Sequence, residues 1–373
     1  MINVVVLLYR DSYFFSQYGP AVRDLQILFE LEKIPEIKKI TVINRPVSIA
    51  EKMCGRKIKR KRIETDKIDT IDSFSWDLFG PLKGRAWSEK IYNDIVHNKL
   101  AELYDENCIN LLLDFLPIGT FSADLKNKWI YWYDLIDNFT KHNRFTPRDR
   151  ELVRKKYKFA CSYANVITGV SLNALNEFPS TINKLVIPNR IFGFNKYDFD
   201  ACNVLKTLKE PEFDFGFIGF ITDKFDFSFI ERLSKEYKIA IYGKCYDRKI
   251  KKKIESMQNV AYFGSFKYNQ LREIMLTFKV GLLPYMAEKS HDESPLKIYE
   301  YLKNNRPCLT SMDFELNNKY IINYNNGISN KTINEMLGFY NKEKITYIID
   351  DEMYLLSTLR KFISNNIIDG IAI

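Results

Sequence analysis

The sequence predicts an α/β protein built from two doubly wound parallel sheets. Short apolar runs rich in Val, Ile and Phe recur along the chain, as expected of strands that are buried on both faces of a parallel sheet. Most are followed by a turn residue and a helical pattern, the order of a doubly wound sheet. This order begins at Ile2–Leu8 and again at Phe213–Gly219, and 373 residues suffice for two full cores.

The first half of the chain is expected to form the first domain. A polar and aromatic loop at Arg10–Gly19 follows the first strand, and a helix is expected from about Pro20 to Leu31. This opening is typical of a Rossmann-like domain, although Gly19 stands alone and no G-x-G-x-x-G motif is present. A further helix is expected at Trp87–Tyr104. The other strands expected here are Lys39–Asn44, Ile109–Phe115, Trp129–Tyr133, Asn165–Gly169 and Lys184–Ile187.

The second half repeats the pattern. A helix is expected at Phe227–Leu233, and a final amphipathic helix at Met353–Ile363. We place an N-terminal domain at 1–190, a C-terminal domain at 191–350, and a C-terminal helix at 351–373 that could cross back to the first domain. The boundary falls at about 190–210, where apolar periodicity is weak. The further strands expected are Ile239–Tyr242, Val260–Phe263 and Val280–Pro284.

Composition excludes several classes of protein. Hydrophobic residues make up 46% of the chain, which indicates a globular protein. Six scattered cysteines without a C-x-x-C pair argue against a zinc site or a disulfide framework and favour a reducing cytosol. Three dispersed histidines predict no metal centre. Neither a signal peptide nor a membrane span is recognised, so we expect a cytoplasmic protein, soluble or peripheral on the inner face of the cytoplasmic membrane.

The net charge of +9 is concentrated locally. The run Lys52–Arg62 carries seven positive charges, and Trp76, Phe79 and Trp87 follow it. Basic residues beside aromatic ones suit an anionic bilayer surface. Nucleic acid is a rival partner, but no recognition motif supports it, and we expect none to bind. A solvated basic loop is the remaining alternative.

The segment 290–310 combines a loop, a short helix and a strand that begins at Cys308. Ser294 is expected to cap the helix with its hydroxyl, and Pro295 then occupies the first helical position, where a missing N–H costs nothing. Asn305 can adopt the left-handed conformation that ends a helix. The free amides at the start of such a helix favour a phosphate.

Three acidic side chains surround this helix start: Asp292 and Glu293 precede it, and Glu300 lies within the helix. A carboxylate repels a phosphate but accepts hydrogen bonds from the hydroxyls of a sugar or a ribose beside it. The alternative is that Glu300 is solvated and pairs with Lys297 or Lys303.

Segment 292–309 resembles the donor-site signature of retaining GT-B glycosyltransferases, in particular the group 1, family 4-like enzymes of bacterial polysaccharide biosynthesis. That signature is an acidic residue, seven further residues, Glu, a small-residue turn and Pro-Val. Asp292 and Glu300 have this spacing, and Glu293 matches the residue type one place later. Asn305-Arg306 replaces the usual glycine. A weaker similarity covers Val170-Ser171 and Ile187-Pro188-Asn189, where Arg190 stands in place of a glycine.

The resemblance implies a GT-B fold, in which two Rossmann-like domains face a cleft. The N-terminal domain would bind the acceptor and the C-terminal domain a nucleotide-diphosphate sugar, such as a UDP or GDP sugar. A hexosyltransferase would move the sugar, with retention, to a saccharide or lipid-linked glycan in cell-surface polysaccharide biosynthesis. No metal or other cofactor is implied. A nucleotide-sugar 2-epimerase and a non-catalytic subunit that binds sugars or nucleotides are alternatives with the same architecture.

The resemblance also implies roles for particular residues. Glu300 would bind the donor ribose, and Asp292 or Glu293 the donor sugar. Lys224 and the amides near Ser294 would hold the diphosphate, while Gly219 would allow close approach of the backbone. The residues implied at the donor site are Gly219, Lys224, His291, Asp292, Glu293, Ser294, Pro295, Leu296, Lys297 and Glu300.

An acceptor side is implied in the N-terminal domain. Asp134 and Asp137 directly follow the strand expected at Trp129–Tyr133, and Gly19 follows the first strand. Ligands of open α/β sheets bind beyond the carboxyl ends of the strands. The alternative is that Asp137 or Asn138 caps the next helix.

Overall fold

The structure is a computed structural model that describes residues 1–53, 62–78, 80–121, 128–141, 145–193, 210–286, 294–314, 316, 318–339 and 353–371. It divides into two compact units. Unit 1 comprises Met1–Pro188 and Leu355–Ile373, and unit 2 comprises Asn189–Tyr354. Each unit is described by itself below.

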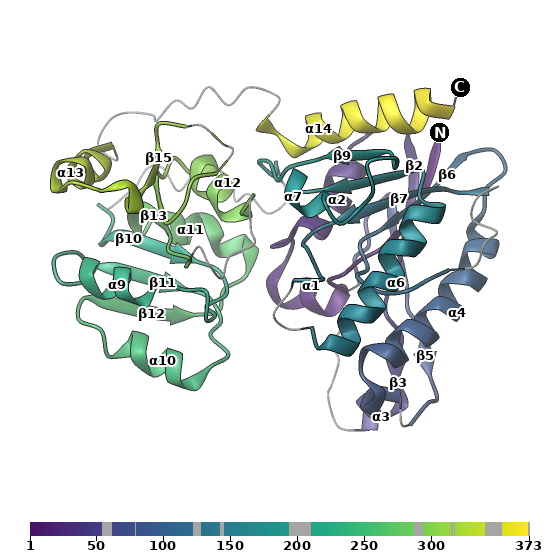
Figure 1. Cartoon of the computed structure of the whole chain (residues 1–373), viewed down its shortest axis with the longest axis horizontal. Coiled ribbons are helices and arrows are strands. Elements are labelled where there is room, and N and C mark those ends of the chain that lie inside the picture. Colours follow the sequence, from purple (N-terminus) through teal and green to yellow (C-terminus); the bar gives the residue numbers. More distant parts are fainter. Residues whose placement is uncertain are drawn as a thin grey trace. The chain divides into compact units, whose positions relative to one another are not determined.

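Unit 1 is built on a parallel sheet whose described strands run in the order β4-β2-β1-β6-β7-β8-β9 (Figure 1). In chain order this is 3-2-1-4-5-6-7, the doubly wound arrangement that the sequence predicts. All six residues of β1 are buried, which explains its unbroken apolar sequence. The strands are β1 (Ile2–Leu7), β2 (Ile37–Ile43), β4 (Ile68–Ile71), β6 (Ile109–Asp114), β7 (Ile130–Leu135), β8 (Val166–Gly169) and β9 (Lys184–Val186).

The helices of unit 1 differ from the prediction in two places. The expected loop at Arg10–Gly19 is wrong, because Ser12–Tyr18 forms α1, whose first amides are capped by the Asp11 carboxylate. A capping box between Thr146 and Asp149 starts another helix, α6, for which the prediction gave no starting residue. The helices are α1, α2 (Arg23–Glu32), α3 (Ile49–Met53), η1 (Gly80–Lys83), α4 (Arg85–Leu103), α6 (Pro147–Tyr163) and α7 (Leu172–Leu175).

A two-stranded parallel sheet, β3 (Val47–Ser48) and β5 (Phe74–Ser75), stands apart from the main sheet of unit 1. Trp76, which follows β5, is 77% exposed. Trp87 is only 5% exposed in α4, with its indole against Gly80. The expectation that Trp87 belongs to an exposed aromatic surface is therefore wrong, and Phe79 lies outside the described residues.

The end of the chain packs against unit 1. Helix α14 (Leu355–Phe362) contacts α2 (Figure 1). The rings of Phe362 and Trp132 lie 4.4 Å apart between centroids. Two short helical stretches, η8 (Ile363–Ile368) and η9 (Asp369–Ile371), continue it. The C-terminal segment thus covers helix α2, in which both polar and apolar side chains are buried.

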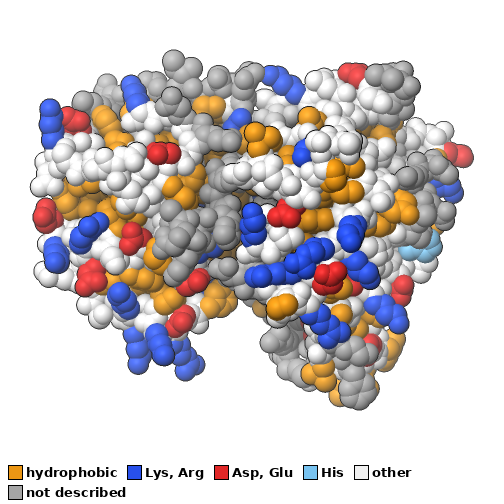
Figure 2. Space-filling view, viewed as in Figure 1, with side chains coloured by type: hydrophobic (Ala, Val, Ile, Leu, Met, Phe, Trp, Pro, Cys, Tyr) orange, Lys and Arg blue, Asp and Glu red, His pale blue; other side chains and the backbone are white. Residues whose placement is uncertain are grey.

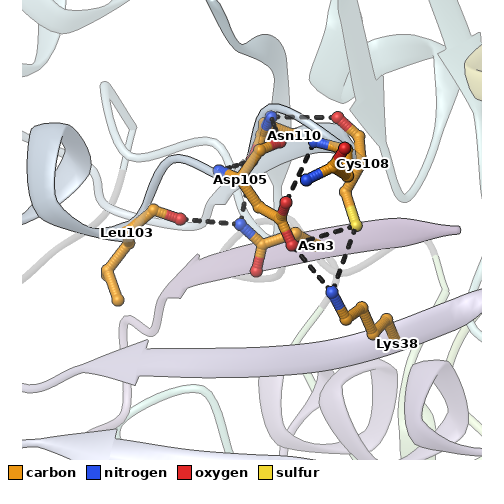
Figure 3. Close-up of polar contacts among 7 residues, drawn as sticks. Asn3, Lys38, Leu103, Asp105, Cys108 and Asn110 are labelled. Carbon is orange, nitrogen blue, oxygen red and sulfur yellow. Dashed lines mark hydrogen bonds and ion pairs between the residues drawn. The ribbon is translucent and has the colours of Figure 1, made fainter.

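A polar cluster closes the amino-terminal edge of the first sheet (Figure 3). Lys38 of β2 donates a hydrogen bond to Asp105 (2.8 Å), and Asn3 of β1 donates to Asn110 of β6 (2.9 Å). The Lys38 ammonium, with the backbone N–H of Asn107, lowers the pKa of Asp105 to about 2. These contacts hold the turn after α4 against the sheet, at the edge opposite the carboxyl ends of the strands.

Unit 2 has a parallel sheet whose described strands run in the order β12-β11-β10-β13-β14-β15, which is 3-2-1-4-5-6 in chain order. These strands are β10 (Phe213–Ile218), β11 (Ile239–Tyr242), β12 (Val260–Gly264), β13 (Phe278–Leu283), β14 (Cys308–Thr310) and β15 (Ile321–Asn323). The helices are α9 (Phe227–Leu233), α10 (Arg248–Glu255), η3 (Tyr268–Gln270), α11 (Leu271–Met275), α12 (Leu296–Lys303), η5 (Tyr324–Asn326) and α13 (Asn330–Gly338).

Helix α12 is fixed to the second sheet by Tyr301. This side chain is fully buried, and its hydroxyl donates to the carbonyl of Leu282 (3.0 Å). A Cβ atom at Gly281 would come within 2.5 Å of the Tyr301 ring, so glycine lets the helix lie close to β13. Asn305 has φ = 57° and ends the helix as predicted.

Candidate functional site

The strand order of unit 2 reverses between β10 and β13, which is where open α/β sheets bind ligands. Gly219 follows β10, and Tyr285 and Met286 follow β13. The Met286 N–H donates to the carbonyl of Lys224 (2.7 Å), and Phe225 forms a β-bridge with Tyr285. The two loops therefore meet at the carboxyl edge of the sheet, and Lys224 lies in this junction.

Gly219 and Lys297 lie against each other at this junction. Gly219 has φ = 124°, a conformation that favours glycine, and a Cβ atom there would lie 2.2 Å from Cε of Lys297. The Lys297 ammonium also hydrogen-bonds to the Tyr285 hydroxyl. A cation from the first turn of α12 is thereby held over the turn after β10.

The start of α12 differs from the prediction. Pro295, not Ser294, is the N-cap residue, and no side chain caps the first turn, which begins at Leu296. The Ser294 hydroxyl instead accepts a hydrogen bond from the N–H of Asn189 (3.1 Å), and the Asn189 side chain donates to the Ser294 carbonyl. The start of an uncapped helix favours an anion, since backbone N–H groups there have no intrahelical acceptor.

Glu300 lies one turn after Lys297 and is 7% exposed. Its Oε1 accepts a hydrogen bond from the hydroxyl of Tyr268 (2.6 Å). The alternative of a solvated Glu300 is therefore wrong. Lys303, one of the two lysines considered as its partner, donates to the carbonyl of Phe192 instead (2.9 Å). A buried carboxylate thus lies on α12 one turn after Lys297, where it is held by the segment that follows β12. Three predicted members of the site, His291, Asp292 and Glu293, lie outside the described residues.

The three residues predicted on the acceptor side have different surroundings in the structure. Asp134 lies within β7, not after it, and is fully buried. Its carboxylate forms a two-pronged ion pair with Arg23 (3.0 and 2.9 Å) and accepts from Thr168 (2.7 Å). Gly19 has φ = 70° and ends α1, while Asp137 is half-buried in the loop after β7.

Three buried ionisable side chains near the carboxyl edge of the first sheet, Asp24, Asp114 and Lys156, were missed by the sequence analysis. Lys156 of α6 donates to Asp114 at the end of β6 (2.5 Å) and to the carbonyl of Gly119 (2.7 Å). Asp24, in the first turn of α2, accepts from the N–H of Arg10 (2.7 Å), and burial raises its pKa to about 6. The position of Asp114 at the end of an apolar strand could have indicated a functional acid. Nothing in the polar sequence around Lys156 indicates that this lysine is buried.

The described part of the chain contains no group of His, Cys, Asp and Glu side chains that could hold a metal ion. Within the same residues, no helix is long and apolar enough to cross a bilayer.

Comparisons of sequence found neither a matching family model nor a matching curated protein. Comparison of the structure found a trehalose-6-phosphate synthase, studied for glycosyltransfer with retention, at a TM-score of 0.57 and 13% identity, over 97% of this chain and 98% of that chain. AviGT4, a glycosyltransferase of avilamycin A biosynthesis, has a TM-score of 0.58 and 8% identity, over 98% of each chain.

The similarity thus extends over whole chains and includes both Rossmann-like units. The chain has the GT-B fold. An α,α-trehalose-phosphate synthase (UDP-forming) from Burkholderia vietnamiensis shares this fold at a TM-score of 0.56 and 10% identity, over 99% of each chain. In this GT-B chain the junction of Gly219, Lys297 and Glu300 lies in the second Rossmann-like unit.

Proposed function

We propose that the protein is a retaining glycosyltransferase that moves a hexose from a nucleotide-diphosphate sugar to a saccharide or lipid-linked glycan. The observation that carries this proposal is the grouping of an uncapped helix start, the Lys297 ammonium and the buried Glu300 carboxylate at the switch point of the second sheet. A diphosphate needs the first two groups, and the hydroxyls of a ribose need the third.

The α12 amides and Lys297 would stabilise the charge that develops on the departing diphosphate. The bond between the anomeric carbon and the diphosphate oxygen breaks, and the acceptor hydroxyl oxygen bonds to that carbon on the same face. The hydroxyl proton passes to the departing diphosphate. Lys224 would be a second cation for this group, and Asp292 or Glu293 would bind the donor sugar.

The remaining parts of the proposal, on the donor, on retention and on the acceptor, are supported by the similarity of the fold to known glycosyltransferases. The related trehalose-6-phosphate synthase is described as an enzyme of glycosyltransfer with retention, and its Burkholderia relative as UDP-forming. The first description supports retention here, and the second supports a nucleotide-sugar donor. We extend the proposal to an acceptor side near Gly19, Asp134 and Asp137 in unit 1, and to cytoplasmic synthesis of a cell-surface polysaccharide.

The test is a panel of UDP and GDP sugars, each incubated with the full chain and scored for release of the nucleoside diphosphate, with and without saccharide acceptors. We expect slow release with one nucleotide and faster release when the right acceptor is present. Interconversion of the sugar without an acceptor would instead indicate an epimerase. Absence of both release and interconversion, with binding retained, would indicate a binding subunit.

Substitution of Glu300 tests the ribose contact. Glu300→Gln preserves size and can still accept from Tyr268, but it removes the charged acceptor. We expect the binding free energy of the preferred nucleoside diphosphate to weaken by roughly 1.5–3 kcal/mol, with little change in folding stability. Calorimetry measures this, and Glu335→Gln on the exposed face of α13 is the charge-matched control. An unchanged dissociation constant for Glu300→Gln would remove this residue from the site.

A further inference from the structure

Tyr268 occupies a defined position beside Glu300. It begins η3, in the segment after β12, and is 7% exposed. Its hydroxyl donates to Oε1 of Glu300 at 2.6 Å, the length of a hydrogen bond to a charged carboxylate. This contact links the loop after β12 to helix α12 across 32 residues of sequence.

The position of Tyr268 is held by its own surroundings. The N–H of Lys267 donates to the side chain of Gln270 (2.9 Å), which closes the turn that carries Tyr268. The Tyr268 ring also packs against Phe192, with centroids 5.9 Å apart. The ring of Tyr268 and the turn that carries it are therefore held by neighbouring protein groups.

A fixed hydroxyl on one carboxylate oxygen constrains the other oxygen. A carboxylate group is planar, and its two oxygens together accept about four hydrogen bonds in defined directions. Once Oε1 is held by Tyr268, the rotation of the Glu300 carboxylate is restricted and Oε2 points in one direction. Such preorganisation lowers the cost of ordering this group when a ligand binds.

We propose that Tyr268 is a positioning residue that orients Glu300 toward the ribose hydroxyls and thereby sets the preference for a ribonucleotide over a 2′-deoxyribonucleotide. The inference rests on the proposed function, because it takes Glu300 as the ribose contact. The Tyr268 hydroxyl has one hydrogen, and it donates this hydrogen to the Glu300 carboxylate. Its contribution therefore appears in the discrimination between the two sugars and not in binding of the diphosphate.

The experiment measures the affinities of UDP, 2′-deoxy-UDP, GDP and 2′-deoxy-GDP by calorimetry on the full chain. We expect the wild-type protein to bind one ribonucleoside diphosphate at least about tenfold more tightly than its 2′-deoxy counterpart. Tyr268→Phe should reduce this ratio to roughly twofold or threefold, while the affinity for the deoxy compound changes little. Glu300→Gln should reduce the ratio to a similar value.

Tyr324→Phe is the matched control, because the Tyr324 hydroxyl also donates to a carboxylate of unit 2, that of Asp226 (3.1 Å), and the residue is 5% exposed. It should leave the ratio at the wild-type value, and the melting temperatures of both variants should be compared. A wild-type ratio in Tyr268→Phe would overturn the positioning role and leave the proposed function intact. Failure of the wild-type protein to bind any nucleoside diphosphate would overturn the proposed function and this inference with it.

Discussion

Asp24 is a carboxyl group whose ionisation is opposed by its surroundings. It is fully buried, and its Oδ1 has no hydrogen-bond partner among the described residues. Burial raises its pKa from 3.8 to about 6. The N–H of Arg10 and other nearby groups lower the pKa, but they offset only part of this effect. Because the folded state binds the proton more tightly than the unfolded state, Asp24 favours folding below about pH 4, and this contribution is lost as the pH rises through 6.

Asp24→Asn should therefore stabilise the protein at neutral pH. The amide oxygen can still accept from Arg10, and no charge has to be buried. We expect the free energy of unfolding at pH 7.5 to rise by about 1–3 kcal/mol, and the gain to disappear near pH 4. Urea denaturation of the wild type and the variant at a series of pH values measures the difference.

Asp105→Asn is the control of opposite sign. The pKa of Asp105 is lowered to about 2, chiefly by Lys38, so its contribution is present above about pH 4 and is lost as the pH falls toward 2 (Figure 3). Its substitution should destabilise the protein equally at pH 5 and pH 8. If Asp24→Asn changed the free energy of unfolding by the same amount at pH 5 and at pH 8, the effect assigned to the burial of Asp24 would be contradicted.

At the scale of one element, helix α12 shows which features can be predicted from the sequence and which cannot. The helix, the left-handed Asn305 and the strand from Cys308 were predicted correctly, because each depends on neighbouring residues. The role of Ser294 was not, since its hydroxyl is taken by Asn189, which lies more than 100 residues earlier. The contacts of Glu300 with Tyr268 and of Lys297 with Gly219 also join residues that are more than 30 positions apart in the sequence, so no local pattern predicts them.

The packing of α12 against the turn after β10 can be tested by Gly219→Ala. The new methyl group would meet Cε of Lys297 and displace the ammonium, and the positive φ would strain the backbone. We expect a loss of stability of about 1–2 kcal/mol and a nucleoside diphosphate affinity lowered about tenfold. Thermal denaturation and calorimetry measure the two effects.

Gly327→Ala distinguishes the effect of backbone strain from the effect of displacing Lys297. Gly327 has φ = 86°, and a Cβ atom there would have no neighbour within 4 Å. It should cost a similar amount of stability and leave the affinity unchanged. Equal losses of affinity in both variants would argue against a role for Lys297 at the diphosphate.

At the scale of the whole chain, the parallel strands and their order follow from apolar runs, and these were predicted to within a few residues. The strands β3, β4, β5 and β15 were missed, because they are short and depend on partner strands elsewhere in their own unit. Trp87 was misassigned to the surface because an aromatic residue in a polar segment carries no sign of its burial. Tertiary packing, not propensity, decides these cases.

Two runs of Lys and Arg are especially dense in the sequence. One is the run Lys52–Arg62, of which Lys52 and Arg62 flank the undescribed part. The other is α10, which exposes Arg248, Lys249, Lys251, Lys252 and Lys253, and Figure 2 shows Lys and Arg side chains gathered over it. Large exposed apolar side chains are more numerous near the first, at Met53 (72%), Trp76 (77%), Leu78 (51%) and Leu82 (85%), than near α10, where Tyr246 (59%) and Phe263 (51%) are exposed.

This difference predicts where an anionic bilayer would bind. Cations near a surface each contribute about 1 kcal/mol, and an exposed indole such as that of Trp76 can insert at the headgroups. Because Arg62 pairs with Asp72 and Glu64, the variant to make is Lys59, Arg60 and Lys61 to Ser. It should release the protein from anionic vesicles in co-sedimentation without abolishing donor hydrolysis, and Trp76→Ser should weaken binding further.

The matched control removes three charges from α10, at Lys251, Lys252 and Lys253. It should leave vesicle binding largely intact, because among the described residues near α10 fewer large apolar side chains are exposed, namely Tyr246 and Phe263. Binding by the wild type should weaken steeply with salt, since the screening length falls to about 3 Å at 1 M. Equal release by both triple variants would mean that net charge alone attracts the protein. Equal binding to neutral and anionic vesicles would refute membrane association through this surface, and the basic run would then fit a solvated face or an acidic glycan.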